Sequence, residues 1–304
     1  MATFPFALYD AFSESVFGGS QAAIVSDAAP LDVDVMERIV QEMGLPAVAF
    51  VTATDKRSVA AKFQSTVMEL PMCGHGTIAL MTRMVELGVF DWADGELIDV
   101  ELRLPSNTAA VTISRRGDGR PFVLLEARPP AFRSDGVDAA RLARRLGLKT
   151  TDFSEEWPIE TALGDFVHLV VPIKDLATMR KVVPDFDGLV KLCRDHGLDT
   201  VALFSSEVER AESTLHVRDF CPAVGVAESA AAGTTNAALS GYLVRHGIVQ
   251  PNGDGQVDIR AEQGHEINRP SSIRSLVSLE KGAIIRLQVG GMATKVADGL
   301  LHLQ

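Results

Sequence analysis

The stretch Glu69-Leu70-Pro71-Met72-Cys73-Gly74-His75-Gly76-Thr77-Ile78-Ala79-Leu80 decides the fold of this chain. It places a cysteine and a histidine on a glycine-rich turn that leads directly into an apolar helix. Backbone N–H groups at a helix start lack intrahelical partners and carry partial positive charge, so such a turn can hold an anion. The same position is expected to lower the pKa of the Cys73 thiol. The alternative is a buried cysteine in front of an ordinary helix.

The pattern occurs twice. The segment that begins at Glu69 can be aligned with the segment that begins at Glu228. Both show an acidic residue, a small-residue turn, a glycine and an apolar helix that ends at a glycine. Helices that are apolar nearly all round are normally buried. The repeat therefore predicts two homologous halves, each wrapped around its own central helix. The aligned pairs are Glu69 with Glu228, Cys73 with Ala232, Gly74 with Gly233, His75 with Thr234, Gly76 with Thr235 and Gly88 with Gly247.

Short apolar or alternating segments, bounded by turn residues, dominate the rest of the chain and predict strands. Helical spacing is found at 32–43, 138–146 and 186–195. Many strands with few helices, and turns of the hairpin type, indicate an α+β fold with mostly antiparallel sheets. The paired prolines at 129–130 suggest a stiff link between the halves. The main predicted strands are 6–9, 22–25, 48–51, 60–63, 100–104, 111–113, 122–126, 166–172, 201–204, 215–220, 257–260, 284–289 and 293–296.

Composition restricts the class of protein. The chain has 304 residues, 46% of them hydrophobic, which is enough for about two domains with proper cores. The net charge of −11 and the scattered basic residues argue against a nucleic-acid partner. No apolar run has the length of a membrane span, and the N-terminus lacks the basic region of a signal peptide. Three cysteines without CxxC spacing indicate reduced thiols, so a cytoplasmic protein is expected.

Segments spread along nearly the whole chain resemble one known family. The matches include the helix-start stretch quoted above, and they recur in both halves. On this set the chain is identified as a member of the phenazine-biosynthesis isomerase-like family, which shares its fold with diaminopimelate epimerase and proline racemase. The further matching segments are Asp10-Ala11-Phe12, Phe17-Gly18-Gly19, Ala49-Phe50-Val51, Arg218-Asp219-Phe220-Cys221-Pro222, Gln263-Gly264, Arg269-Pro270-Ser271 and Val289-Gly290-Gly291.

The resemblance implies two pseudo-symmetric halves, each a curled, mostly antiparallel sheet around a central helix. The N-terminal half would comprise residues 1–128, completed by the last strand at about 285–304, and the C-terminal half residues 129–284. It also implies an active site in the cleft between the halves, a cofactor-independent isomerase and a homodimer. The substrate would be a small molecule, and the two helix starts favour an anionic one.

Three positions depart from the family pattern. Ala47 stands where the family usually has the glutamate that acts as its general acid/base, and alanine cannot move a proton. Ser229 replaces an aspartate, and Ser20-Gln21 replaces Asn-Pro after Gly19. Both glycine-rich helix starts remain, so altered chemistry is favoured over lost function.

The remaining candidate residues are suited to proton transfer by one acid/base group. Racemases of this fold use one cysteine in each half, but here Ala232 occupies the second position, so a symmetrical two-thiol mechanism is not expected. One acid/base suffices for a proton shift, a double-bond isomerisation or an epimerisation on a small carboxylated or carbonyl-activated substrate. It also suffices for a lyase or dehydratase reaction by β-elimination. A third alternative is a non-catalytic binding homologue.

Cys73 is the first candidate for the acid/base and His75 the second. An anion-binding site and a pocket wall are expected around them. Glu228 is a candidate ligand contact, although capping of the helix start is the simpler role for it. No cluster has zinc-ligand spacing and no nucleotide-binding loop occurs, so neither a metal nor a cofactor is expected. The expected binding residues are Ser20, Gln21, Gly74, Gly76, Glu228, Ser229, Gly233, Thr234 and Thr235.

Overall fold

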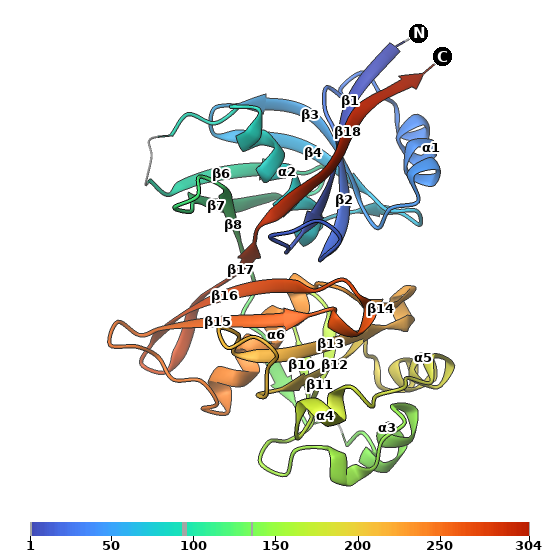
Figure 1. Cartoon of the computed structure of the whole chain (residues 1–304), viewed down its shortest axis with the longest axis vertical. Helices are drawn as coiled ribbons and strands as arrows, with labels where there is room; N and C mark the ends of the chain where they lie inside the picture. Colours follow the sequence, from blue (N-terminus) through green and yellow to red (C-terminus); the bar gives the residue numbers. More distant parts are fainter. Residues whose placement is uncertain (1, 93–95, 135, 304) are drawn as a thin grey trace. The chain divides into compact units, whose positions relative to one another are not determined.

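The chain forms two compact units in the computed structural model, which describes residues 2–92, 96–134 and 136–303 (Figure 1). Unit 1 comprises Met1–Glu126 with Gly290–Gln304, and unit 2 comprises Ala127–Val289. β17, Ala283–Gly291, leads from unit 2 into unit 1. Within the described residues, no helix is both long and apolar enough to cross a membrane.

Unit 1 is a mixed sheet with two helices. β1 pairs antiparallel with both β2 and the last strand, β18, along most of its length. β2–β3 and β4–β6 are parallel pairs, whereas β3–β4, β6–β7 and β7–β8 are antiparallel. Its elements are β1 Ala2–Ala11, β2 Ser20–Val25, α1 Val33–Met43, β3 Val48–Asp55, β4 Ser58–Gln64, β5 Glu69–Leu70, α2 Gly74–Glu86, β6 Ile98–Arg103, β7 Thr108–Arg115, β8 Pro121–Glu126 and β18 Ala293–Leu303.

Unit 2 repeats this order of pairings. β11–β12 and β13–β15 are parallel, whereas β10–β11, β12–β13 and β15–β16 are antiparallel. Its elements are β9 Ala131–Arg133, α3 Ala139–Arg145, β10 Glu160–Leu163, β11 Val167–Pro172, α4 Leu176–Met179, α5 Phe186–His196, β12 Thr200–Ser205, β13 Leu215–Cys221, β14 Val226–Ser229, α6 Gly233–Arg245, β15 Gln256–Gln263 and β16 Ser271–Glu280, with short 3-10 turns η1 Thr150–Asp152, η2 Pro222–Val224 and η3 His265–Ile267.

The two central helices occupy equivalent places. α2 and α6 each have 13 residues, and they begin and end at the positions that the repeat predicts. Each follows a short strand, β5 or β14, and precedes a strand that pairs in parallel with an earlier one. α2 packs against β1, β2, β3, β8 and β18, and α6 packs against β10, β11 and β16. The predicted α+β fold, a sheet around a central helix in each half, is confirmed.

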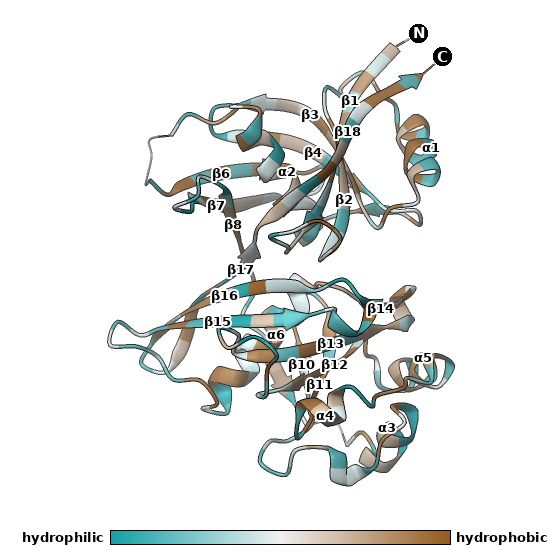
Figure 2. Cartoon of the chain, in the orientation of Figure 1, coloured by the Kyte–Doolittle hydropathy of each residue, from teal (hydrophilic) through white to brown (hydrophobic). Residues whose placement is uncertain are grey.

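The outer helices cover separate cores. α1 begins at the N-cap Asp32, whose side chain accepts a hydrogen bond from the Val35 N–H at 3.0 Å, and it ends at Gly44 in the left-handed conformation. α3 and α5 bury their apolar faces against the strands of unit 2. Figure 2 shows hydrophilic and hydrophobic residues alternating along α1 and α5, as expected of helices with one buried face. α4 was not among the predicted helices, because a single turn has too few residues to show a period.

Gly290 offers a direct test of the strand packing in unit 1. A Cβ at this position would lie 1.8 Å from the carbonyl oxygen of Val123 and 2.8 Å from the Cα of Leu124. Gly290→Ala is therefore expected to lower the free energy of unfolding by about 3 kcal/mol, since backbone atoms cannot yield as a flexible side chain can. The measurement is urea unfolding followed by circular dichroism.

Gly117→Ala is the matched control, because a Cβ there would meet no atom within 4 Å and no positive φ is involved. Equal unfolding midpoints for the two variants would contradict the close approach of β17 to β8.

Candidate functional site

The first candidate site lies at the start of α2. Cys73 is the N-cap residue in an extended conformation, and no side-chain hydrogen bond caps the helix. The first full turn closes when the N–H of Thr77 donates to the carbonyl of Cys73 at 2.8 Å, and the Thr77 hydroxyl donates to the same oxygen at 2.8 Å. The preceding N–H groups belong to Gly74, His75 and Gly76. The sequence predicts that these N–H groups bind an anion, and that role stays a prediction.

Cys73 and His75 are in contact. The Cys73 sulfur lies 3.6 Å from both ring nitrogens of His75, Nδ1 and Nε2. A sulfur in line with the lone pair of one nitrogen would be clearly farther from the other one. The thiol therefore lies against the imidazole without a directed hydrogen bond, and a preformed thiolate–imidazolium pair is not present.

Burial keeps both groups neutral. It raises the pKa of the Cys73 thiol from 9.0 to about 12, and the backbone N–H of Gly76 offsets this only in part. Burial lowers the pKa of His75 to about 4, although its side chain keeps some exposed surface. The expectation of a lowered pKa at Cys73 is therefore wrong, because desolvation of the buried thiolate outweighs the helix dipole. At pH 7 the imidazole is free to accept a proton and the thiol is not ionised.

Gly76 allows this close arrangement. A Cβ at Gly76 would lie 2.9 Å from the Cys73 sulfur and 2.9 Å from Cε1 of Phe63. The Phe63 ring is fully buried, so it cannot move aside easily. Gly74, by contrast, has open space where a Cβ would lie. The second glycine of the turn is thus required by packing, whereas the first is not.

The start of α6 is built from a different set of side chains. Ala232 is its N-cap residue, again with no side-chain cap. The buried hydroxyl of Thr235 donates to Oδ2 of Asp219 at 2.7 Å, so this hydroxyl is turned into the protein. The backbone groups at this helix start, the partly exposed Gly233 and the exposed Thr234 remain accessible to an anion.

Asp219 is a residue of this site that the sequence argument missed. It is 1% exposed, and burial raises the pKa of its carboxyl. Its Oδ2 also lies 3.3 Å from the Cys221 sulfur, while its Oδ1 has no hydrogen-bond partner. A single aspartate between Arg218 and Phe220 on a strand gives no sign of this role, because the contact with Thr235 depends on the position of α6.

Glu228 forms an ion pair. Arg218 donates from Nε and Nη2 to its two carboxylate oxygens at 2.9 and 2.8 Å, and each of the two side chains is 6% exposed. Arg218 also donates to the carbonyls of Met179 and Val182. Glu228 therefore neither caps α6 nor offers a free carboxylate to a ligand, and its role is structural. Removing one partner of such a buried pair costs about 3–5 kcal/mol.

The predicted wall residues lie on strands beside the helix starts. Ser20 and Gln21 begin β2, where they pair with Ala11 and Asp10, and both are partly exposed. Ser229 ends β14, and its carbonyl accepts a hydrogen bond from Gln263 at 2.7 Å. These three positions are next to α2 or α6 in sequence or packing, and their contact with a substrate stays a prediction.

Ala47 lies next to β3 and is fully buried. Its carbonyl accepts a hydrogen bond from the N–H of Ala23 at 3.1 Å, which joins it to β2. The position where the resemblance implies a glutamate is therefore closed to solvent in this chain.

Comparison with known proteins shows the family of this chain. The family model described as "phenazine biosynthesis-like protein" matches residues 9–299. An uncharacterized isomerase of Bacillus subtilis, YfhB, is 26% identical over 296 residues, 97% of each chain. The trans-2,3-dihydro-3-hydroxyanthranilate isomerase of Pseudomonas chlororaphis is 27% identical over 299 residues, 98% of this chain and 99% of the relative. The enzyme class indicated by these relatives is that of an isomerase.

Solved structures share the fold. A phenazine biosynthesis protein of the PhzF family from Bacillus anthracis has a TM-score of 0.89 at 21% identity and covers 100% of both chains. A hydroxyproline epimerase from Agrobacterium vitis has a TM-score of 0.63 at 12% identity, covering 98% of this chain and 92% of the other. The predicted likeness in fold to the PhzF family and to proline racemase-like proteins is confirmed.

The neutral thiol predicts the pH dependence of Cys73 alkylation. Only the thiolate reacts, and with a pKa of about 12 its fraction keeps increasing well above pH 9. Iodoacetamide labelling of the Cys73 peptide, followed by mass spectrometry, is expected to be slow at pH 7 and to accelerate continuously to pH 10. A rate that levels off at or below pH 9 would show that the helix start governs the thiol after all.

The two glycines of the turn form a matched pair of variants. Gly76→Ala is expected to displace the Cys73 sulfur or the Phe63 ring and to lower the free energy of unfolding by about 1–3 kcal/mol. Gly74→Ala should remain within about 0.5 kcal/mol of the parent protein, because its Cβ meets nothing. Thermal and urea unfolding of both variants tests this, and a reversed order would rule out the packing described here.

Proposed function

This chain belongs to the phenazine biosynthesis-like protein family, and we propose that it is a cofactor-independent isomerase. Its substrate would be a small carboxylated or carbonyl-activated molecule, and the reaction a proton shift between two carbons of that molecule. The single observation that carries this proposal is the contact between His75 and the Cys73 sulfur at the N-terminus of α2, at 3.6 Å. Burial disfavours the charged form of both groups there.

In this proposal His75 is the base. The sequence alone made Cys73 the first candidate and His75 the second. Its imidazole takes a proton from the carbon next to the carboxylate or carbonyl, so the C–H bond breaks and its electron pair moves into the substrate as an enolate. The N–H groups at the helix start stabilise the negative charge that develops on oxygen. The imidazolium then returns the proton to a second carbon on the same face. No oxidant, reductant or metal enters the balance.

In this proposal Cys73 stays a neutral thiol, a hydrogen donor beside the His75 ring. Its burial and its contact with His75 make the ring's surroundings poor in water, which favours return of the same proton over exchange. Ala47 fits the assignment, because no carboxylate competes with His75 for the proton. Anion binding by Gly74 and Gly76 at this helix start is part of the same proposal, and Gly233 and Thr234 remain predicted anion-binding residues at the start of α6. A homodimer and a cytoplasmic location remain expectations.

The experiment measures isomerisation in deuterated water. The first compound is trans-2,3-dihydro-3-hydroxyanthranilate, the substrate in the name of the Pseudomonas chlororaphis relative, followed by a panel of small hydroxy and amino acids. An isomerase gives a product of unchanged composition, apart from any deuterium gained. Loss of water or of another β-substituent would identify a lyase instead. Binding of a compound without turnover or deuterium incorporation would identify a non-catalytic homologue.

Substitutions test the assignment of His75. His75→Ala is expected to lower kcat by about 10²–10⁴-fold, the usual contribution of a general base. Ala47→Glu should not raise activity, because an unpaired carboxylate in this buried place becomes neutral or destabilises the fold. His246→Ala is the control: this histidine lies in unit 2 and pairs with Glu160 at 2.8 Å.

The pH dependence of kcat/KM tests whether the pKa of His75 is lowered. A base with a pKa of about 4 stays unprotonated in mild acid, so kcat/KM should remain level from pH 8 to about pH 5. A decline centred near pH 6.5 would indicate an unperturbed imidazole. Full activity in His75→Ala together with loss in Cys73→Ala would return the acid/base role to the thiol.

A further inference from the structure

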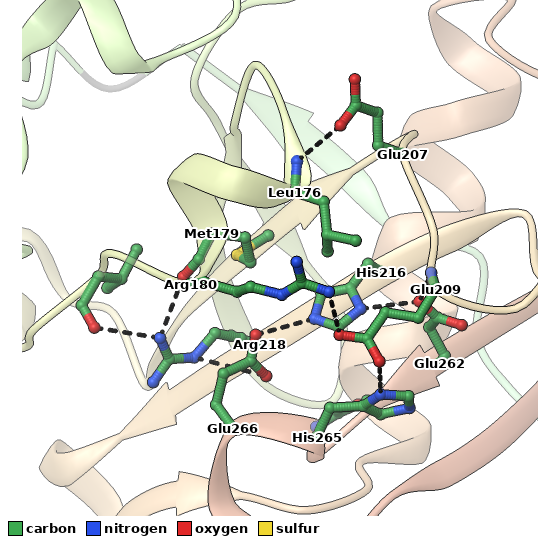
Figure 3. A network of polar contacts seen from close by, with 12 residues as sticks. Leu176, Met179, Arg180, Glu207, Glu209, His216, Arg218, Glu262, His265 and Glu266 are labelled. Carbon is green, nitrogen blue, oxygen red and sulfur yellow. Dashed lines mark hydrogen bonds and ion pairs between the residues drawn. The ribbon is translucent and has the colours of Figure 1, made fainter.

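Unit 2 contains a cluster of two histidines and three glutamates that the proposed reaction does not use (Figure 3). His216, on β13, has its Nδ1 2.8 Å from Glu262 and its Nε2 3.0 Å from Oε1 of Glu266. His265, on η3, has its Nδ1 2.9 Å from Oε2 of Glu209. Three separate parts of the chain therefore bring imidazole nitrogens and carboxylate oxygens to one place.

A cavity of about 430 Å³ opens beside the cluster. Two buried polar atoms of its lining residues have no hydrogen-bond partner, namely Nε2 of His265 and Oε2 of Glu266, although Nε of Arg218 lies 4.0 Å from the Glu266 oxygen. Buried polar atoms are normally hydrogen-bonded, so Nε2 of His265 in particular leaves a place for a ligand. The lining residues are Arg180, Glu209, His265, Glu266, Asn268 and Pro270.

The charges of the cluster are not balanced. Glu209, Glu262, Glu266 and the adjoining Glu228 contribute four carboxylates. Two guanidinium groups face them: Arg180 donates to Glu209 at 2.8 Å, and Arg218 donates to Glu228. Before the imidazoles are counted, four carboxylates and two guanidinium groups leave two negative charges, which is the charge that one divalent cation supplies.

We propose that Glu209, His216 and His265 bind a divalent transition-metal ion, with Glu266 as the fourth ligand. The donor atoms of the first three residues all lie within 4.8 Å of one another. Zinc bonds of about 2.0–2.2 Å in a tetrahedron need donors about 3.3 Å apart. Shifts of about an ångström would bring the set to that spacing.

The two nitrogens of His216 have separate roles in this arrangement. Nε2 lies 3.0 Å from Oε1 of Glu266, and the metal ion would lie between these two groups. Nδ1 lies 2.8 Å from Oε1 of Glu262, which keeps this hydrogen bond and orients the ring as an outer partner does in other metal sites.

The ligand chemistry selects the class of metal. Two imidazoles and two carboxylates suit Zn²⁺ and related transition metals, whereas Mg²⁺ and Ca²⁺ prefer six or more oxygen ligands. Arg180 occupies Oε1 of Glu209 and leaves Oε2 directed towards His265. The bound ion would join the loop after β12 to β13 and η3, and so hold these three segments of unit 2 together.

The test is calorimetric titration of the full-length, metal-free chain with Zn²⁺. One ion per chain is expected, and Mg²⁺ should not compete at equal concentration. His265→Ala and Glu209→Gln change side chains at the rim of the cavity, 13% and 32% exposed, so both variants should fold. Each is expected to weaken zinc binding by about 100-fold or more, since loss of even an outer partner costs about 10–100-fold.

His246→Ala provides the matched control, because it removes another histidine–glutamate pair of the same unit. It should bind zinc as the parent protein does, and so should Cys73→Ala. Cobalt substitution adds a spectroscopic check: tetrahedral Co²⁺ bands without a thiolate charge-transfer band are expected. Undiminished zinc binding in His265→Ala, loss of binding in Cys73→Ala, or no binding by the parent chain would each overturn the proposal.

Discussion

Each unit must bury one helix that is apolar on nearly all sides, and most of the architecture follows from this requirement. A helix with a single apolar stripe can lie on one face of a sheet, as α1 does. α2 and α6 expose almost none of their middle turns, so strands have to surround them. Only the first turn of such a helix can reach a ligand. The predicted site residues Cys73 and His75 in one unit, and Gly233 and Thr234 in the other, lie at these helix starts, and their part in a reaction stays a proposal.

The repeated helix was predictable because its information is local. A small-residue turn, a glycine and an apolar segment specify where α2 and α6 begin, and the structure places both where the repeat predicts. The alternation of parallel and antiparallel pairings was not predicted. Short apolar strands look alike in sequence, and the direction in which β2 and β3 pair depends on the path of α1 between them. The same holds for α4 and α5 between β11 and β12.

The errors at the site have one physical origin. A helix start attracts negative charge, and from sequence alone this is the only term visible at Cys73. Burial acts in the opposite direction and is larger, but it depends on how the strands pack around α2, among them β4 with Phe63. Contacts between separate elements also hide Asp219 and the pairing of Glu228 with Arg218. Linear spacing gives no sign of the proposed metal ligands, because Glu209, His216 and His265 come from a loop, a strand and a turn.

The two halves have kept the same scaffold while their helix starts have diverged. In unit 1 the residues after the turn present a thiol and an imidazole, and Gly76 leaves room for both. In unit 2 the position equivalent to Gly76 is Thr235, whose hydroxyl is directed inward to Asp219. A side chain bonded to the interior is not available to a ligand, so the two helix starts differ in the groups that they can offer. The start of α6 offers mainly backbone N–H groups, whereas the start of α2 also carries the partly exposed imidazole of His75.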